Sequence, residues 1–175
     1  FMKPDSAIFR QRDAFYIPNW TADVHYELEV VVRIHRLGKN IEPRFAPKYF
    51  TDFTVGIDFT ARDVQSELKS KGLPWEKAKA FDQSAVLGDF LSVADHDINN
   101  LNFQLKKNGE VVQDGNTSLM IHDIPHIIEH CSQYFTLKIG DLIFTGTPAG
   151  VGPVAPGDLL EGYIEGKKVL NVKIR

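Results

Sequence analysis

The sequence lacks several features that would assign a protein to a class at once. Its 175 residues include one cysteine, Cys131, which excludes an internal disulfide and a zinc site built from four thiolates. A single thiol fits a reducing compartment, so we expect a cytoplasmic protein. No apolar run approaches the roughly 20 residues of a membrane-spanning helix, and the start, FMKPDSAIF, lacks the charged-then-apolar order of an export signal.

An excess of charge of one sign is also lacking. Lysine and arginine number 20 against 23 aspartate and glutamate, and the net charge of −3 gives no electrostatic reason to expect a nucleic-acid or anionic-membrane partner. The glycine-rich stretch GDLIFTGTPAGVG has neither the G-K-[ST] of a phosphate-binding loop nor the dinucleotide G-x-G-x-x-G pattern. No G-x-S-x-G or H-E-x-x-H motif is present.

What the sequence does contain is a series of β-strand patterns without repeats or linkers, which predicts a single β-rich domain over residues 1–175. Asn108-Gly109 predicts a two-residue hairpin between two of the strands. Two helices are expected, one opening at Thr60 with a capping box to Asp63 and one over Pro125–Tyr134. The predicted strands are Tyr26–Ile34, Phe50–Phe59, Leu101–Lys107, Glu110–Gln113, Asp141–Thr145, Leu159–Ile164 and Val169–Ile174.

The strand HYELEVVVRI carries two acidic residues, Glu27 and Glu29, just before its most apolar run. Alternate side chains of a strand share a face, so the two carboxylates lie side by side. Asp58 ends a second strand and adds a third carboxylate. Three hard oxygen donors suit Mg²⁺, Mn²⁺ or Ca²⁺. The alternative is two surface glutamates with a helix-capping aspartate, and the pattern alone favours that alternative.

Other polar residues have two interpretations each. Arg62 and Gln65 are three apart on the first helix, where they could grip a carboxylate or simply form a solvated face. Lys79 is either an ordinary surface lysine or a buried donor. Thr145 and Thr147 stand beside glycines after an apolar strand, which suits either a loop that holds a small anion or a tight turn.

Taken together and in this order, six motifs closely resemble the fumarylacetoacetate hydrolase family, in particular its acylpyruvate hydrolase and oxaloacetate decarboxylase branch. Each motif alone is weak, but six in register along nearly the whole chain are specific. They are FMKP, HYELEVVV, GIDFTARDVQ, KGLPWEKAKAFD, NGEVVQDGNTSLMI and GDLIFTGTPAGVGPVAPGD.

The resemblance implies a β-rich α+β fold, with mixed β-sheets rolled into a sandwich and short helices, usually as a homodimer. It implies that Glu27, Glu29 and Asp58 hold Mg²⁺ or Mn²⁺, with Ca²⁺ as a further option. Lys79 falls on a catalytic position of the family. Four further residues fall on positions that line its substrate site: Lys3, Arg62, Gln65 and Thr147. Members of the family also carry a His and Glu on an N-terminal lid ahead of the F-x-K-P motif. We expect a native lid segment upstream of the first residue, Phe1; the alternative is a protein that has lost hydrolysis and keeps a metal-assisted reaction that needs no lid.

The function that the resemblance implies is Mg²⁺-dependent hydrolysis of a C–C bond in acylpyruvate or β-diketo acid substrates, through an enolate. Oxaloacetate decarboxylation and keto–enol or double-bond isomerisation of 2-hydroxy-dienedioates are alternatives in the same site. A different class also stays open, namely a non-catalytic carboxylate-binding domain stabilised by a divalent cation.

Overall fold

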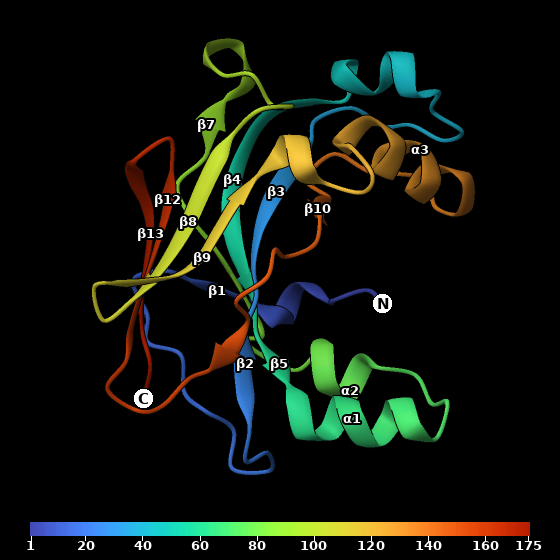
Figure 1. Cartoon of the computed structure of the whole chain (residues 1–175). Coiled ribbons are helices and arrows are strands. Elements are labelled where there is room, and N and C mark those ends of the chain that lie inside the picture. Colours follow the sequence, from blue (N-terminus) through green and yellow to red (C-terminus); the bar gives the residue numbers. More distant parts are fainter.

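The computed structural model describes residues 1–175, and β-strands dominate it (Figure 1). Three sheets are present, and the β1–β6 pair is their only parallel pair. The largest sheet has the order β1 (Ile8–Arg10), β6 (Ala85–Leu87), β4 (Phe50–Asp58), β3 (Leu28–Ile34) and β10 (Leu142–Phe144), with β7 (Leu91–Ser92) paired to β4. A four-stranded sheet has the order β13 (Lys167–Lys173), β12 (Leu159–Ile164), β8 (Asn102–Lys107) and β9 (Glu110–Asn116). The smallest joins β11 (Gly152–Pro153), β2 (Val24–Tyr26) and β5 (Thr60–Ala61).

The hydrophobic core lies between the two larger sheets. The central strands β3 and β4 read as nearly continuous apolar runs because most of their residues are buried. Gly162 of β12 approaches them so closely that a Cβ atom there would lie 3.0 Å from Val55 Cγ2. Elsewhere in the core, the rings of Phe15 and Phe59 stack with centroids 3.9 Å apart. The packing holds β3 and β4 rigidly, and these are the strands that carry the acidic residues.

Short helices sit at two ends of the sheets (Figure 1). Helices α1 (Arg62–Ser70) and α2 (Glu76–Lys79) follow β5, whereas α3 (Ile124–Tyr134) packs near the opposite end against the 3₁₀ helix η2 (Pro43–Lys48). The remaining 3₁₀ turns are η1 (Asp5–Ala7), η3 (Val93–Asp95) and η4 (Thr117–Leu119). None of these helices has the length and apolar character needed to cross a membrane. A β-rich fold of mixed sheets with short helices is therefore confirmed.

The predicted strands are all found, with one informative difference. The run predicted over Tyr26–Ile34 breaks at Glu27 into β2 and β3, which pair with different neighbours. The Asn108-Gly109 hairpin joins β8 to β9, with both residues at positive φ.

The predicted capping box of the first helix is wrong. The helix begins after Ala61 with no side-chain cap, because the Thr60 hydroxyl accepts a hydrogen bond from Lys79 and the Asp63 carboxylate accepts one from the Thr21 hydroxyl. The second helix forms as predicted, with the Asp123 side chain as its N-cap and Pro125 in its first turn.

Candidate metal centre

Three acidic side chains meet where β2, β3 and β4 come together. Glu27 lies at the break between β2 and β3, Glu29 lies in β3, and Asp58 is the last residue of β4. The Asp58 N–H donates to the Glu27 carbonyl oxygen at 2.9 Å, which fixes the strand ends beside each other. Ligand atoms of the three carboxylates all lie within 4.8 Å of one another, and the residues are 8%, 6% and 1% exposed, respectively. Surface glutamates with a helix-capping aspartate, the alternative interpretation, are not what the structure contains.

Of the two interpretations of Lys79, the structure confirms the buried donor. Lys79 bridges two of the three carboxylates. Its ammonium nitrogen donates to Glu27 Oε2 and to Asp58 Oδ2, each at 2.7 Å, and to the Thr60 hydroxyl at 2.5 Å. An ammonium has three N–H donors, so all of them are engaged. Only 3% of Lys79 is exposed. The helix α2 that carries it was not predicted, because four residues are too few for a periodic pattern.

Two further cations complete the charge balance. The Lys3 ammonium lies 2.8 Å from Asp58 Oδ1 and is held by the Ser84 hydroxyl and the Lys79 carbonyl. The Arg62 guanidinium donates to Glu27 Oε1 at 2.5 Å and to Gln65 Oε1 at 2.6 Å. Asp63, which could have been the partner of Arg62 on a solvated face, turns instead toward Thr21. Three carboxylates thus face three cations.

The three cations contact Glu27 and Asp58 but not Glu29, so Glu29 is the carboxylate with the least positive charge beside it. Its one hydrogen bond comes from the Gly146 N–H, at 2.6 Å, and it forms no ion pair. Burial, followed by the charge of Asp58, raises the pKa of Glu29 to about 7. Burial also acts to raise the pKa of Glu27, but Lys79 and Arg62 outweigh it and the net pKa is lowered. Glu29 therefore gains most from a bound cation.

The donor set supports the same conclusion. Asp58 Oδ1 is buried and its partner is the Lys3 ammonium at 2.8 Å, and a carboxylate oxygen has a further lone pair that can bind a cation. Clustered carboxylate oxygens with no thiolate nearby match the donor set of a hard divalent cation. The residues present fit such an ion, and a divalent-cation site is indicated.

The glycine-rich loop after β10 binds a carboxylate of the protein itself, that of Glu29. The hydroxyls of Thr145 and Thr147 donate to the carbonyl oxygens of Val30 and Leu28, at 2.9 Å and 2.8 Å. Neither hydroxyl proton is free for an anion, whereas the Gly146 N–H binds Glu29. The Thr147 N–H has no partner within the chain, so it is one donor available to a ligand.

The sequence did not reveal the positioning roles of three residues, namely Thr60, Ser84 and Gln113. Thr60 and Ser84 are fully buried and hold the ammonium groups of Lys79 and Lys3. Their signal is weak in the sequence because each partner lies 19 or more residues away.

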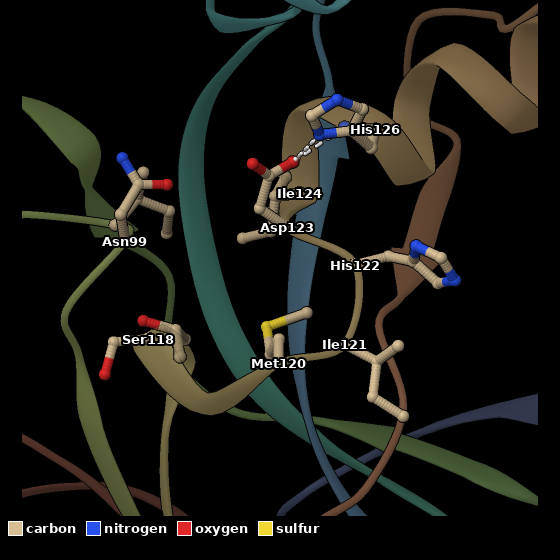
Figure 2. Close-up of a pocket in the computed structure, with 10 residues that line it drawn as sticks. Asn99, Ser118, Met120, Ile121, His122, Asp123, Ile124 and His126 are labelled. Atoms are coloured by element: carbon tan, nitrogen blue, oxygen red, sulfur yellow. Dashed lines mark hydrogen bonds and ion pairs between the residues drawn. The ribbon is translucent and has the colours of Figure 1, made fainter.

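A separate cavity of about 530 Å³ lies near the start of α3, away from the carboxylates (Figure 2). Asp123 and His126 face each other across its rim, joined by a hydrogen bond of 2.6 Å (Figure 2). Its lining includes Asn99, Ser118 and Met120 but no residue of the acidic group. The chemistry indicated by the three carboxylates is therefore not located in this cavity.

The fold and the site together define a β-sheet protein with a buried three-carboxylate centre for a divalent cation. The model of the family described as fumarylacetoacetate (FAA) hydrolase C-terminal matches residues 1–175. The chain belongs to the fumarylacetoacetate hydrolase family, as its motifs indicated.

Relatives within the family carry several names. An oxaloacetate tautomerase of Escherichia coli K12 is 41% identical over 168 residues, which cover 95% of this chain and 77% of that protein. A mitochondrial oxaloacetate decarboxylase of Dictyostelium discoideum is 39% identical, with the same coverage of 95% and 77%. The solved fumarylpyruvate hydrolase from Pseudomonas aeruginosa, in complex with Mn²⁺ and pyruvate, is 33% identical with a TM-score of 0.93, covering 99% of this chain and 77% of that one.

Proposed function

We propose that this protein is a divalent-metal-dependent enzyme of small 2-oxo acids, and that its main reaction is keto–enol tautomerisation of an oxo-diacid such as oxaloacetate. The observation that carries the proposal is the buried group of three carboxylates enclosed by Lys3, Arg62 and Lys79. The names of the relatives from Escherichia coli and Bos taurus, both oxaloacetate tautomerases, support this choice over hydrolysis, which the motifs alone had favoured.

Glu27, Glu29 and Asp58 would hold the cation, Mg²⁺ or Mn²⁺, with Ca²⁺ as a further option. When bound there, it would supply a Lewis acid that polarises the 2-oxo group of the substrate. Mn²⁺ is the ion named with the Pseudomonas aeruginosa relative, which supports the class of ion rather than its identity.

Arg62, Gln65 and the Thr147 loop would bind the substrate's carboxylates. Arg62 uses two of its five N–H donors on Glu27 and Gln65, and its side chain is 24% exposed, so it has donors within reach of a ligand. The free N–H of Thr147 is a further donor. An oxo-diacid carries two carboxylates, and the two groups of donors would orient it.

Lys79 is the candidate catalytic residue. Tautomerisation breaks no C–C bond: toward the keto form, the Lys79 ammonium would donate a proton to C3, and its neutral amine would then accept the proton of the hydroxyl on C2. The Lys79 ammonium is the buried proton donor among the carboxylates, but its three bonds are all occupied. To reach a substrate, Lys79 must give up one of these three hydrogen bonds. A cation bound by Glu27 and Asp58 would weaken the two bonds that Lys79 makes to these carboxylates. Lys3, held by the Ser84 hydroxyl, would add to the positive charge that attracts the carboxylates of an oxo-diacid.

Hydrolysis of a C–C bond in acylpyruvates is the second candidate, favoured by the likeness to fumarylpyruvate hydrolase. It requires a base that activates water, whereas tautomerisation does not. Decarboxylation of oxaloacetate is a third reaction that the same donors would support, and the Dictyostelium discoideum relative carries that name.

A substrate panel separates these reactions. Wild-type protein with Mg²⁺ is given oxaloacetate, acetylpyruvate and fumarylpyruvate, and the enol absorbance and pyruvate release are followed together. We expect fast loss of the oxaloacetate enol form, abolished by EDTA and by Asp58→Asn. The matched control is Asp52→Asn. Asp52 lies in the same strand as Asp58, but its partner is Arg33. Cation binding without turnover of any of these compounds would favour a non-catalytic carboxylate-binding domain.

The proposal includes one catalytic domain over residues 1–175, a homodimer and a cytoplasmic location. The free Cys131 supports a reducing compartment, but relatives named as mitochondrial make cell fractionation the deciding experiment. Light scattering coupled to gel filtration tests the homodimer.

A further inference from the structure

The segment between Glu27 and Glu29 has no neighbouring strand on one of its sides. On that side β10 pairs with β3 as far as the Phe144–Val31 pair, and β11 begins to pair with β2 only at Gly152 and Tyr26. The residues in between form the glycine-rich loop instead of a strand. Leu28 faces this gap, and its backbone N–H and C=O need partners because buried backbone groups are rarely left unpaired.

Side chains provide both partners. The Leu28 N–H donates to Gln113 Oε1 at 2.9 Å, and the Leu28 carbonyl oxygen accepts from the Thr147 hydroxyl at 2.8 Å. Gln113 Nε2 then donates to Thr147 Oγ1 at 2.8 Å and to the Pro148 carbonyl oxygen at 3.0 Å. These bonds form a closed ring that joins the acid-bearing strand, the loop and β9 of the other sheet. Gln113 is 1% exposed, so its amide is committed to this ring.

The loop is also pressed against β9 by shape. Gly150 has a φ of +99°, and a Cβ atom there would lie 2.1 Å from the Val112 carbonyl oxygen and 3.3 Å from Gln113 Cγ. The position of the loop on β9 therefore determines whether the Gln113 amide can reach its partners, and the Gln113 hydrogen bonds in turn hold the loop in that position. The same loop supplies the Gly146 N–H, which is the one hydrogen bond of Glu29.

We infer that Gln113 is a positioning residue of the cation centre, which sets the Gly146 N–H and the Thr147 N–H by tying their loop to Leu28. The inference rests on the proposed role of Glu29 as a cation ligand. The Gln113 amide makes no hydrogen bond to any of the three carboxylates. It acts through Leu28, which lies between Glu27 and Glu29, and through the loop that holds the Glu29 carboxylate.

The expected size of the effect follows from this geometry. Partners that orient metal ligands usually change metal affinity by about 10–100-fold when they are removed. Without the amide, the loop keeps its bond from Thr147 to Leu28 but loses both bonds to β9. We therefore expect Gln113→Met to raise the Mn²⁺ dissociation constant by about tenfold, and the KM for oxaloacetate to rise more than kcat falls.

The test is calorimetric titration of Mn²⁺ into metal-free wild type, Gln113→Met and the control Gln104→Met. Gln104 lies in the neighbouring strand β8, where its amide binds the exposed Asp114. The control should bind Mn²⁺ like wild type. Weakened Mn²⁺ binding in Gln113→Met alone supports the inference. A Gln113→Met protein that melts at a lower temperature yet binds Mn²⁺ with wild-type affinity overturns it, since Gln113 would then be structural only.

A second variant keeps the inference testable if Gln113→Met does not fold. Gln113→Glu retains the acceptor for the Leu28 N–H and removes the donor to Thr147 and Pro148, so the same readouts apply. The failure of the proposed function looks different: wild type itself would then bind no Mn²⁺, which overturns both claims. Wild-type affinity in all variants overturns the role of Gln113 alone.

Discussion

Replacing Lys79 by methionine should destabilise the metal-free protein far more than the metal-bound one. The substitution keeps an unbranched side chain but removes the ammonium that bonds Glu27 and Asp58 at 2.7 Å each. Both carboxylates stay buried, at 8% and 1% exposure, and lose their common partner. Removing one member of a buried ion pair typically costs about 3–5 kcal/mol of unfolding free energy.

The size of the effect makes it easy to measure. For a domain of this length, 1 kcal/mol corresponds to about 2–4 °C in melting temperature, so the expected fall is roughly 6–20 °C in EDTA. With saturating Mg²⁺ the cation compensates the same carboxylates, and the difference from wild type should shrink to a small part of that value. Thermal unfolding of both proteins in EDTA and in Mg²⁺ gives the four melting temperatures.

Lys77→Met is the matched control, because Lys77 lies in the same short helix, is exposed and forms no ion pair. It should melt like wild type in both buffers. The reasoning is refuted if Lys79→Met loses equal stability with and without Mg²⁺, since the ammonium and the cation would then not serve the same carboxylates. Turnover should fall by about 10²-fold or more even where stability is restored.

Four further outcomes are expected from the structure. Glu29→Gln should abolish Mg²⁺ binding in calorimetry, and unchanged binding would remove Glu29 from the ligand set. Because the pKa of Glu29 is about 7 and a ligand carboxylate must be deprotonated, Mg²⁺ affinity should fall as the pH drops below 7, and a flat profile from pH 8 to pH 5.5 would contradict this. Arg62→Met should raise the KM for oxaloacetate by about tenfold or more with a smaller change in kcat, and an unchanged KM would show that Arg62 serves Glu27 alone. Gly150→Ala should destabilise the protein in urea unfolding because its Cβ would lie 2.1 Å from a carbonyl oxygen, whereas Gly109→Ala, also at positive φ but with open space, should cost less.

Local patterns predicted the strands well because the signals they use are local. The apolar runs of β3 and β4 and the Asn108-Gly109 turn need no distant partner to be recognised. The capping box failed for the opposite reason. Thr60 and Asp63 have the right spacing, but Lys79 and Thr21 compete for their side chains from elsewhere in the chain.

The site divides in the same way. The E-x-E spacing of Glu27 and Glu29 is visible in the sequence, but whether water or protein covers the pair depends on Asp58 and Lys79, which other elements bring to it. Motif order along the whole chain supplied what spacing did not. Gln113 stayed hidden because a glutamine in an edge strand looks like part of a solvent face, and only the gap beside Leu28 gives it a buried role.

The most direct test of the central claim, that the three carboxylates hold a cation on which a 2-oxo acid is bound, is a titration with oxalate. Oxalate is a stable mimic of an enolised 2-oxo acid and needs no turnover to be measured. Calorimetry should show that wild type binds oxalate in Mg²⁺ but not in EDTA, and that Glu29→Gln binds it in neither. Equal oxalate binding with and without Mg²⁺, or undiminished binding in Glu29→Gln, would contradict the account.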